Sequence, residues 1–203
     1  MSAVLSTLPS TSKARSHPAT QIKWTADEFH QMWSFGFFPG RRPYLLNGII
    51  LEQGPMDAPH ANGVERADTA VRAAFGAGWR YRIQLPLVLN QHTDPMPDVA
   101  VVAGHLTGSP DHPTTAALVI EVADTTLKSD TTEKAEQYAT AGIEDYWVLD
   151  LNGRKLIVYR DPAPLPASLG ATAYRKQQIL GPTDRVVPLA APNSSILVGE
   201  LLP

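Results

Sequence analysis

The chain has 203 residues, no cysteine and a formal net charge of −3 at pH 7. This length favours one domain with a sizeable core, and the lack of cysteine excludes disulfides and thiolate zinc sites. The small negative charge argues against a general polyanion-binding surface, although it is compatible with a local basic groove. No apolar run approaches the ~20 residues of a membrane span, so we expect no membrane partner. The lack of cysteine fits a cytoplasmic location, which we expect for this protein.

The N-terminal segment differs in composition from the rest of the chain. Residues 1–21 are rich in Ser, Thr, Ala and Pro and contain no acid. This composition predicts a disordered tail, and we expect residues 22–203 to form a single domain. Thr25 and Glu28 have the spacing of a capping box and predict that a helix begins there.

A hairpin, a helix and a strand region are predicted next. The dipeptide Asn47-Gly48 is typical of a tight turn and predicts a hairpin over residues 44–51. Residues 61–75 repeat their apolar side chains at the helical period. Residues 79–89 predict one or two strands, in which Arg80 and Arg82 alternate with Tyr81 and Ile83 and give one basic face.

Two later apolar runs each contain a single acid. Residues 97–102 carry Asp98 near their start, and residues 118–122 carry Glu121 in their middle. Burying an unpaired carboxylate costs several kcal/mol, so Glu121 needs a cationic partner, a metal ion or a proton. If the two strands pair, the two acids meet, and a divalent cation such as Mg²⁺ would relieve their repulsion.

The stretch after Glu121 predicts a helix and then a second hairpin. Asp130 has the position of a helix N-cap, and Gly142 has that of a C-terminal stop. Residues 145–150 and 155–159 predict two strands, and Asn-Gly at 152–153 predicts the tight turn between them.

The segment from residue 97 to residue 159 resembles the Uma2 family of restriction endonuclease-like proteins. This family is also called DUF820 and belongs to the PD-(D/E)XK nuclease superfamily. The similarity rests on Pro97-Asp98, on Glu121-Val122 and on the Asp, Lys, Tyr, Ala-Gly and Tyr-Trp residues spread over 130–147, and it extends from about Trp24 to the C-terminus. The resemblance implies an α/β fold with a restriction endonuclease-like core, in which helices flank a central mixed β-sheet. It also implies an endonuclease that hydrolyses DNA phosphodiester bonds with Mg²⁺ or Mn²⁺, and a homodimer by analogy.

The same resemblance suggests roles for individual residues. Asp98 and Glu121 are the predicted catalytic acids and metal ligands, with the Val122 backbone carbonyl as a third ligand. A cationic side chain should orient the attacking water and stabilise charge in the transition state.

The position of that cationic side chain departs from the superfamily pattern. The superfamily has a lysine two residues after the second acid, where this chain has Ala123. We predict that Lys134, on the following helix, takes this catalytic role, because family members carry a lysine there. Lys128 is a competing candidate that is nearer in sequence.

Two further residues, Glu52 and His60, match family positions near the site and are possible additional site residues. His60 could bind phosphate, or it could cap or pack against a helix. Family members often have a glutamate where this chain has Leu45, so the site has fewer acids here. This loss favours an alternative function, in which the protein is a catalytically degenerate module that binds nucleic acid or protein. A glycosidase with two carboxylates is a third possibility, but the sequence shows no clear aromatic platform for a sugar.

Overall fold

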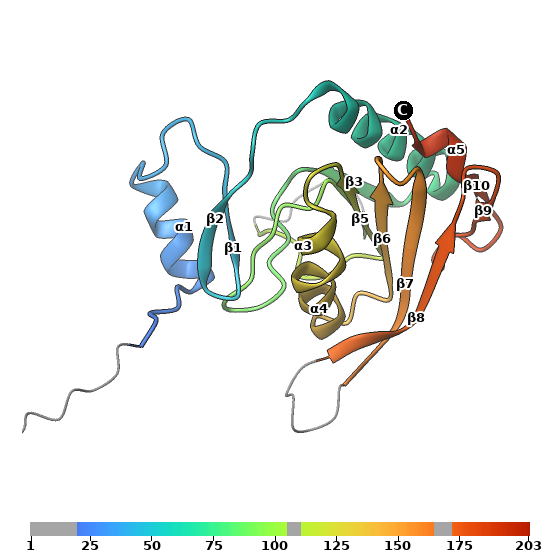
Figure 1. Cartoon of the computed structure of the whole chain (residues 1–203). Coiled ribbons are helices and arrows are strands. Elements are labelled where there is room, and N and C mark those ends of the chain that lie inside the picture. The colour runs from blue at the N-terminus through green and yellow to red at the C-terminus, as the bar shows by residue number, and fades with distance from the viewer. Residues whose placement is uncertain (1–19, 105–110, 165–171) are drawn as a thin grey trace, which may run out of the picture.

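The computed structural model describes residues 20–104, 111–164 and 172–203. The predicted tail therefore lies almost wholly outside the described residues. The centre of the fold is a six-stranded sheet in the order β3-β4-β5-β6-β7-β8 (Figure 1). Its strands are β3 (Trp79–Ile83), β4 (Val99–Ala103), β5 (Leu118–Ala123), β6 (Asp145–Asp150), β7 (Lys155–Pro164) and β8 (Thr172–Leu180).

Strands β5 and β6 are parallel, and every other neighbouring pair in this sheet is antiparallel. A parallel pair needs a crossover, and here α3 (Leu127–Thr131) and α4 (Glu133–Thr140) provide it. The predicted α/β class with a central mixed sheet is thus confirmed.

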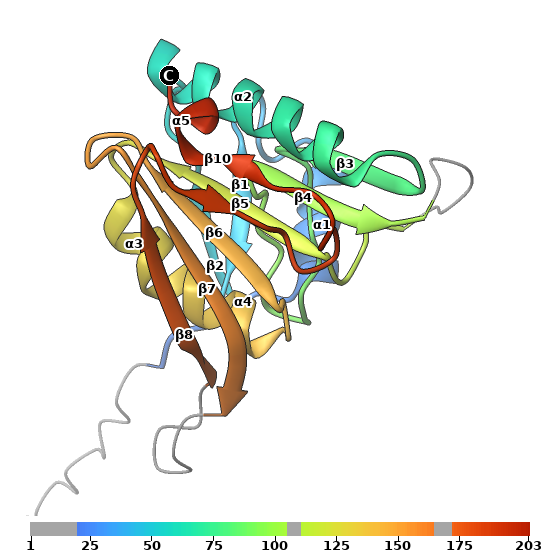
Figure 2. The ribbon, with the colours of Figure 1, turned by 90° about the vertical axis from the view of Figure 1, so that its right-hand side faces the viewer.

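Helices cover both faces of the sheet, as Figures 1 and 2 show. On one face lie α2 (Ala58–Phe75) and the short helix α5 (Val198–Leu201), and on the other lie α3 and α4. Because both faces are covered, β5 is buried along its whole length and reads as a continuous apolar run, interrupted by Glu121. The short strands β9 (Arg185–Val186) and β10 (Ile196–Leu197) pair separately beside α5.

A small lobe stands beside the main sheet and consists of α1 (Ala26–Ser34), β1 (Pro43–Leu46) and β2 (Ile49–Glu52) (Figure 1). The predicted capping box is confirmed, because the Thr25 and Glu28 side chains each accept a hydrogen bond from the other residue's backbone N–H. The predicted hairpin turn is also confirmed: Asn47 and Gly48 both have positive φ angles, 50° and 79°, as a type I′ turn requires.

The predicted N-cap role of Asp130 is wrong. Asp130 lies within α3, and the helical stretch is interrupted at Thr132, where φ is −122° and ψ is −87°. Its carboxylate is buried and pairs with Lys134, so it is directed into the protein instead of toward the free N–H groups of α4. The predicted C-terminal stop at Gly142 is confirmed, since this glycine follows α4 and its C-cap residue Ala141 and has a φ of 75°.

The second predicted hairpin is present, but its turn is longer than expected. Strands β6 and β7 are joined by four residues, 151–154, and the left-handed residue is Arg154 with a φ of 48°. The Gly153 N–H donates a 2.7 Å hydrogen bond to Asp150 Oδ1. A Cβ atom on Gly153 would overlap the Asp150 carboxylate, so glycine is needed there for close approach.

Helix α2 packs against β5 through a glycine. Gly63 is buried on its inner face, where an added Cβ would lie 2.9 Å from Val122 Cγ1 and 3.3 Å from Leu151 Cδ2. In the described parts of the chain, no helix has both the length and the apolar character needed to cross a bilayer.

Candidate active site

The pairing of β4 with β5 brings Asp98 and Glu121 to the same face of the sheet. Val99 pairs with Ile120, and one further step in this antiparallel register sets Asp98 opposite Glu121. Side chains alternate between the two faces of a strand. Both acids therefore lie on the face covered by α3 and α4, and both line one cavity of about 180 Å³.

Asp98 is only 4% exposed and is held by three donors. Its Oδ1 lies 3.1 Å from His60 Nε2 and accepts a 3.0 Å bond from Gln84 Nε2, and its Oδ2 accepts a 2.8 Å bond from the Val122 N–H. Burial alone would raise the pKa of Asp98, but the His60 contact and the other donors outweigh it and lower this pKa. Asp98 is therefore an ionised carboxylate at neutral pH.

Glu121 is 2% exposed and has a different environment. Its Oε1 accepts a 2.7 Å hydrogen bond from the Tyr138 hydroxyl, and its Oε2 lies 3.1 Å from Lys134 Nζ. Burial raises the pKa of Glu121 to about 7, although the charge of Lys134 opposes this rise. Glu121 is thus the more easily protonated of the two acids.

Lys134 projects from the first turn of α4 into the cavity, where its side chain is 12% exposed. Nζ also lies 2.8 Å from Asp130 Oδ1, and the other Asp130 oxygen accepts a hydrogen bond from the Thr126 hydroxyl. Burial would lower the pKa of Lys134, but the charges of Glu121 and Asp130 outweigh it and raise this pKa. The amine is therefore a fixed positive charge beside Glu121. Lys128 is exposed on α3 and is not among the residues that line this cavity.

The remaining predicted residues lie at the wall and mouth of the same cavity. His60, in the first turn of α2, contacts Asp98, and its hydrogen bond to Asp98 raises the pKa of the imidazole. Glu52, at the end of β2, is half-exposed and lies 3.6 Å from Arg41 Nη1, so it belongs to the rim. Next to it, Gln53 donates from Nε2 to the Met96 carbonyl, while its Oε1 is buried with no partner among the described residues.

The donor atoms of the cavity fit a hard divalent cation. The Asp98 and Glu121 carboxylates and the unpaired Gln53 Oε1 are oxygen donors, the type that Mg²⁺ and Mn²⁺ prefer. The N–H and C=O of one strand residue point to the same side of the strand, so the Val122 carbonyl lies on the Asp98 side, where its N–H donates. In the described chain, no group of three His, Asp or Glu side chains is arranged to hold a metal. A cation here would therefore rely on carbonyls, water and substrate for its other ligands.

A family model described as "Uma2: Putative restriction endonuclease" matches residues 26–198. The chain belongs to the Uma2 family. Its structure is similar to the crystal structure of a putative nuclease belonging to DUF820 from Anabaena variabilis ATCC 29413, with a TM-score of 0.66. The two sequences are 16% identical, and the match covers 87% of this chain and 96% of the other, so the likeness shows the shared fold. A comparison with curated proteins found no match.

Sequence reasoning missed several polar partners in this Uma2 site. Gln84 follows β3 in a left-handed conformation, with a φ of 51°, and no local pattern predicts its contact with Asp98. Tyr138 has the spacing of a packed aromatic residue on α4, and its hydroxyl contact with Glu121 depends on the fold. The pair of Asp130 with Lys134, by contrast, is indicated by the sequence, since the acid precedes the lysine by four residues, the spacing of a helical ion pair.

Proposed function

We propose that this Uma2 protein is a Mg²⁺-dependent endonuclease that hydrolyses phosphodiester bonds in DNA. The observation that carries the proposal is the grouping of Asp98 and Glu121 on one face of the sheet, with the Lys134 amine 3.1 Å from Glu121. Membership of a family described as restriction endonuclease supports the same reaction class.

The side chains of the site have different proposed roles in hydrolysis. A bound Mg²⁺ or Mn²⁺ would supply polarisation of the phosphoryl oxygen and a more acidic water. Asp98, Glu121 and the Val122 carbonyl would hold it. Lys134 keeps its proton, so it stabilises negative charge on the phosphate and orients the attacking water through an N–H donor.

Glu52 and His60 are proposed to assist from the edge of the cavity. His60 has a raised pKa because of Asp98, so it carries positive charge over a wider pH range than a free imidazole and can hold a phosphate oxygen. Glu52 could offer an additional carboxylate at the rim, in a site that has Leu45 where relatives often have a glutamate.

Cleavage of supercoiled plasmid and single-stranded DNA with Mg²⁺ or Mn²⁺ tests this proposal. Asp98→Asn and Glu121→Gln keep the size of each side chain and remove its charge, so we expect each to lower the cleavage rate at least about a hundredfold. Glu65→Gln on the exposed side of α2 is the matched control and should cleave like the wild type. Metal-dependent cleavage that survives both Asp98→Asn and Glu121→Gln would contradict the proposal.

The alternative is a catalytically degenerate member that binds nucleic acid or protein. It is favoured by one observation: Lys134 already pairs with both Glu121 and Asp130, so these two acids are partnered without a metal ion. Calorimetry with Mg²⁺ and Mn²⁺ separates the two functions, since the degenerate module would show neither metal binding nor cleavage.

The homodimer, proposed by analogy, is tested by sedimentation, and the cytoplasmic location by cell fractionation.

A further inference from the structure

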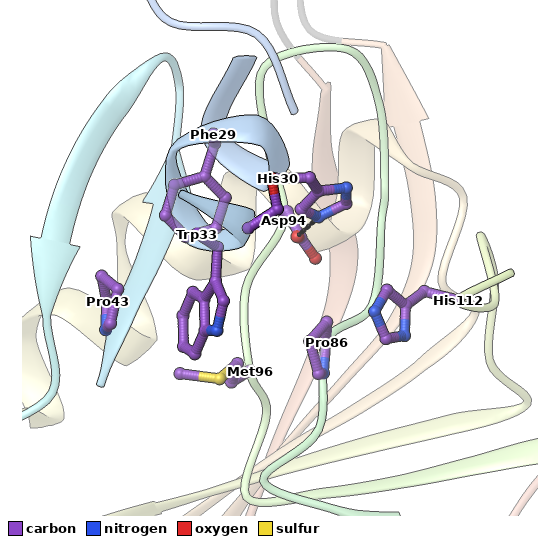
Figure 3. Close-up of a pocket in the computed structure, with 9 residues that line it drawn as sticks. Phe29, His30, Trp33, Pro43, Pro86, Asp94, Met96 and His112 are labelled. Carbon is purple, nitrogen blue, oxygen red and sulfur yellow. Dashed lines mark hydrogen bonds and ion pairs between the residues drawn. The ribbon is translucent and has the colours of Figure 1, made fainter. Parts of the chain in front are cut away.

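A second cavity, of about 380 Å³, lies between α1 and the segment that leads to β4, and we call it the α1 cavity (Figure 3). Its walls are mainly apolar and come from Phe29, Trp33, Pro43, Pro86 and Met96. Trp33 packs edge-on against Phe29, with 6.1 Å between the ring centroids, yet 46% of its surface is exposed. The cavity therefore has an aromatic side chain that a flat ligand could stack against.

An acid lies at the floor of this apolar cavity. Asp94 is only 1% exposed, although it lies in a loop. Its Oδ2 lies 2.7 Å from His30 Nε2, but its Oδ1 has no hydrogen-bond partner among the described residues. A buried oxygen without a donor is costly, and a ligand that brings an N–H group would remove that cost.

The charges around Asp94 favour a neutral donor over a cationic ligand. Arg82 Nη2 donates to the Pro86 carbonyl and lies 3.2 Å from His112 Nδ1 at the side of the cavity. His30 and Arg82 both act on Asp94, yet burial still raises the pKa of its carboxyl group. The Arg82 charge that acts on Asp94 would repel an incoming organic cation, whereas it would not repel a neutral amino group.

The α1 cavity and the candidate active site share a wall. Pro43 lines the first cavity, and its neighbours on both sides, Arg42 and Tyr44, line the second. The side chain of Gln53, in the active-site cavity, donates a 3.1 Å hydrogen bond to the carbonyl of Met96, in the α1 cavity. A nucleic-acid strand held at one cavity would thus lie next to the other.

We propose that the α1 cavity binds an unpaired nucleobase that carries an exocyclic amino group, and so recognises the strand beside the cleavage site. The base stacks against Trp33, and its amino group donates to Asp94 Oδ1. This inference rests on the proposed endonuclease function, because it assigns a strand-recognition site to that same reaction.

Calorimetric titration with adenosine and inosine tests base binding directly. These nucleosides differ at two neighbouring ring positions: adenosine carries an amino group at C6 and an unprotonated N1, whereas inosine carries a carbonyl at C6 and a proton on N1. In EDTA, we expect adenosine to bind at least about tenfold more tightly, because in the proposed pose the C6 substituent faces Asp94 Oδ1, which accepts from the adenosine amino group and repels the inosine carbonyl. Equal affinities, or no adenosine binding at millimolar concentration, would overturn the proposal.

Asp94→Asn tests whether Asp94 Oδ1 accepts a hydrogen bond from the amino group of the base. The asparagine carbonyl can still accept from His30, which leaves its NH₂ group to face the ligand. We expect the preference for adenosine to disappear or to reverse toward inosine. An undiminished preference in a folded variant would contradict the role given to Asp94.

A second pair of variants tests stacking on Trp33 and leaves the buried Asp94 unchanged. Trp33→Leu should weaken both nucleosides about tenfold, because it removes the stacking surface. Phe35→Leu removes an exposed aromatic side chain that does not line the cavity and should leave both affinities unchanged. Equal effects of these two changes, or none from Trp33→Leu, would count against the site.

Oligonucleotides distinguish a base in a strand from a free nucleoside. Single-stranded oligodeoxyadenylate should bind more tightly than adenosine and more tightly than the same oligomer in a duplex, and Trp33→Leu should weaken it. If adenosine binds as tightly as the oligomer, the cavity is a nucleoside site and strand recognition is wrong. Glu121→Gln should keep adenosine binding while it loses cleavage, so failure of the endonuclease proposal remains distinguishable from failure of this one.

Discussion

The Lys134 side chain is the residue on which the electrostatics of the candidate site depend. It lies between Glu121 and Asp130, two acids with almost no exposure to solvent, and it is their shared cation. A lysine that neutralises two carboxylates keeps its proton, so it can stabilise charge in a transition state but cannot act as a base.

Lys134→Met keeps much of the side-chain length and removes the amine. We expect the cleavage rate to fall about a hundredfold, while affinity for Mg²⁺ is kept in mildly alkaline buffer, where Glu121 stays ionised without Lys134. The free energy of unfolding should fall by about 3 kcal/mol, because two buried acids lose their partner. Cleavage kinetics, calorimetry and urea denaturation measure these three quantities.

Lys128→Met is the matched comparison for this experiment, since Lys128 is exposed on the neighbouring helix. If the rate is unchanged in Lys134→Met and falls in Lys128→Met, the catalytic amine has been assigned to the wrong helix.

Among the elements, α2 contributes to the candidate site through its first two turns. Its first turn presents His60 to Asp98, and its next turn places Gly63 against the side chain of Val122. The absence of a Cβ at position 63 lets the helix approach the strand that carries the proposed metal ligands.

Gly63→Ala tests this close approach. The new methyl would lie 2.9 Å from Val122 Cγ1, so the helix or the strand must shift. Alanine favours a helix over glycine by about 1 kcal/mol, but overpacking of a core costs about 1–3 kcal/mol. We therefore expect a net loss of stability in urea denaturation and weaker metal binding. A stabilised variant with unchanged metal affinity would show that the interface between α2 and β5 accommodates a methyl group at position 63.

The sequence predicted most elements because their signals are local. The capping box at Thr25, the turn at Asn47-Gly48 and the apolar run of β5 each lie within a few neighbouring residues. Asp130 was misassigned because its ion pair with Lys134, which a capping pattern ignores, decides where its side chain points. The burial of Asp94 has no local signal, because it depends on α1, which is far away in sequence and contacts it through His30.

The candidate site shows the same division between local and distant signals. The meeting of Asp98 and Glu121 could be anticipated from two strands with one acid each, and Lys134 from family resemblance. Gln84 and Gln53 could not, because they reach the cavity from the end of β3 and from the hairpin lobe. The catalytic roles and the single domain over 22–203 stay predictions.

For the whole molecule, a buried site with excess acid predicts that metal binding and folding are linked. Asp98, Glu121 and Asp130 face one lysine and one histidine around the cavity. A ligand that binds only the folded state stabilises it by about 2.7 kcal/mol at a hundredfold excess over its Kd. We therefore expect Mg²⁺ or Mn²⁺ to raise the Tm of the wild type, and EDTA to reverse the rise.

Asp98→Asn is the control for this thermal measurement and should respond far less to either metal. A Tm that is indifferent to 10 mM of both metals in the wild type, or an equal rise in Asp98→Asn, would favour the degenerate module.

The antiparallel ladder between β4 and β5 has a consequence for how this protein can evolve. Point substitutions along β4 leave Asp98 directed toward the candidate site, but a one-residue slip in the ladder would turn it to the opposite face, into the apolar layer beneath α2. A single-codon insertion or deletion in this strand would therefore remove the acid from the site and bury its charge among apolar side chains. We therefore expect related sequences to differ in β4 by substitutions and not by insertions or deletions.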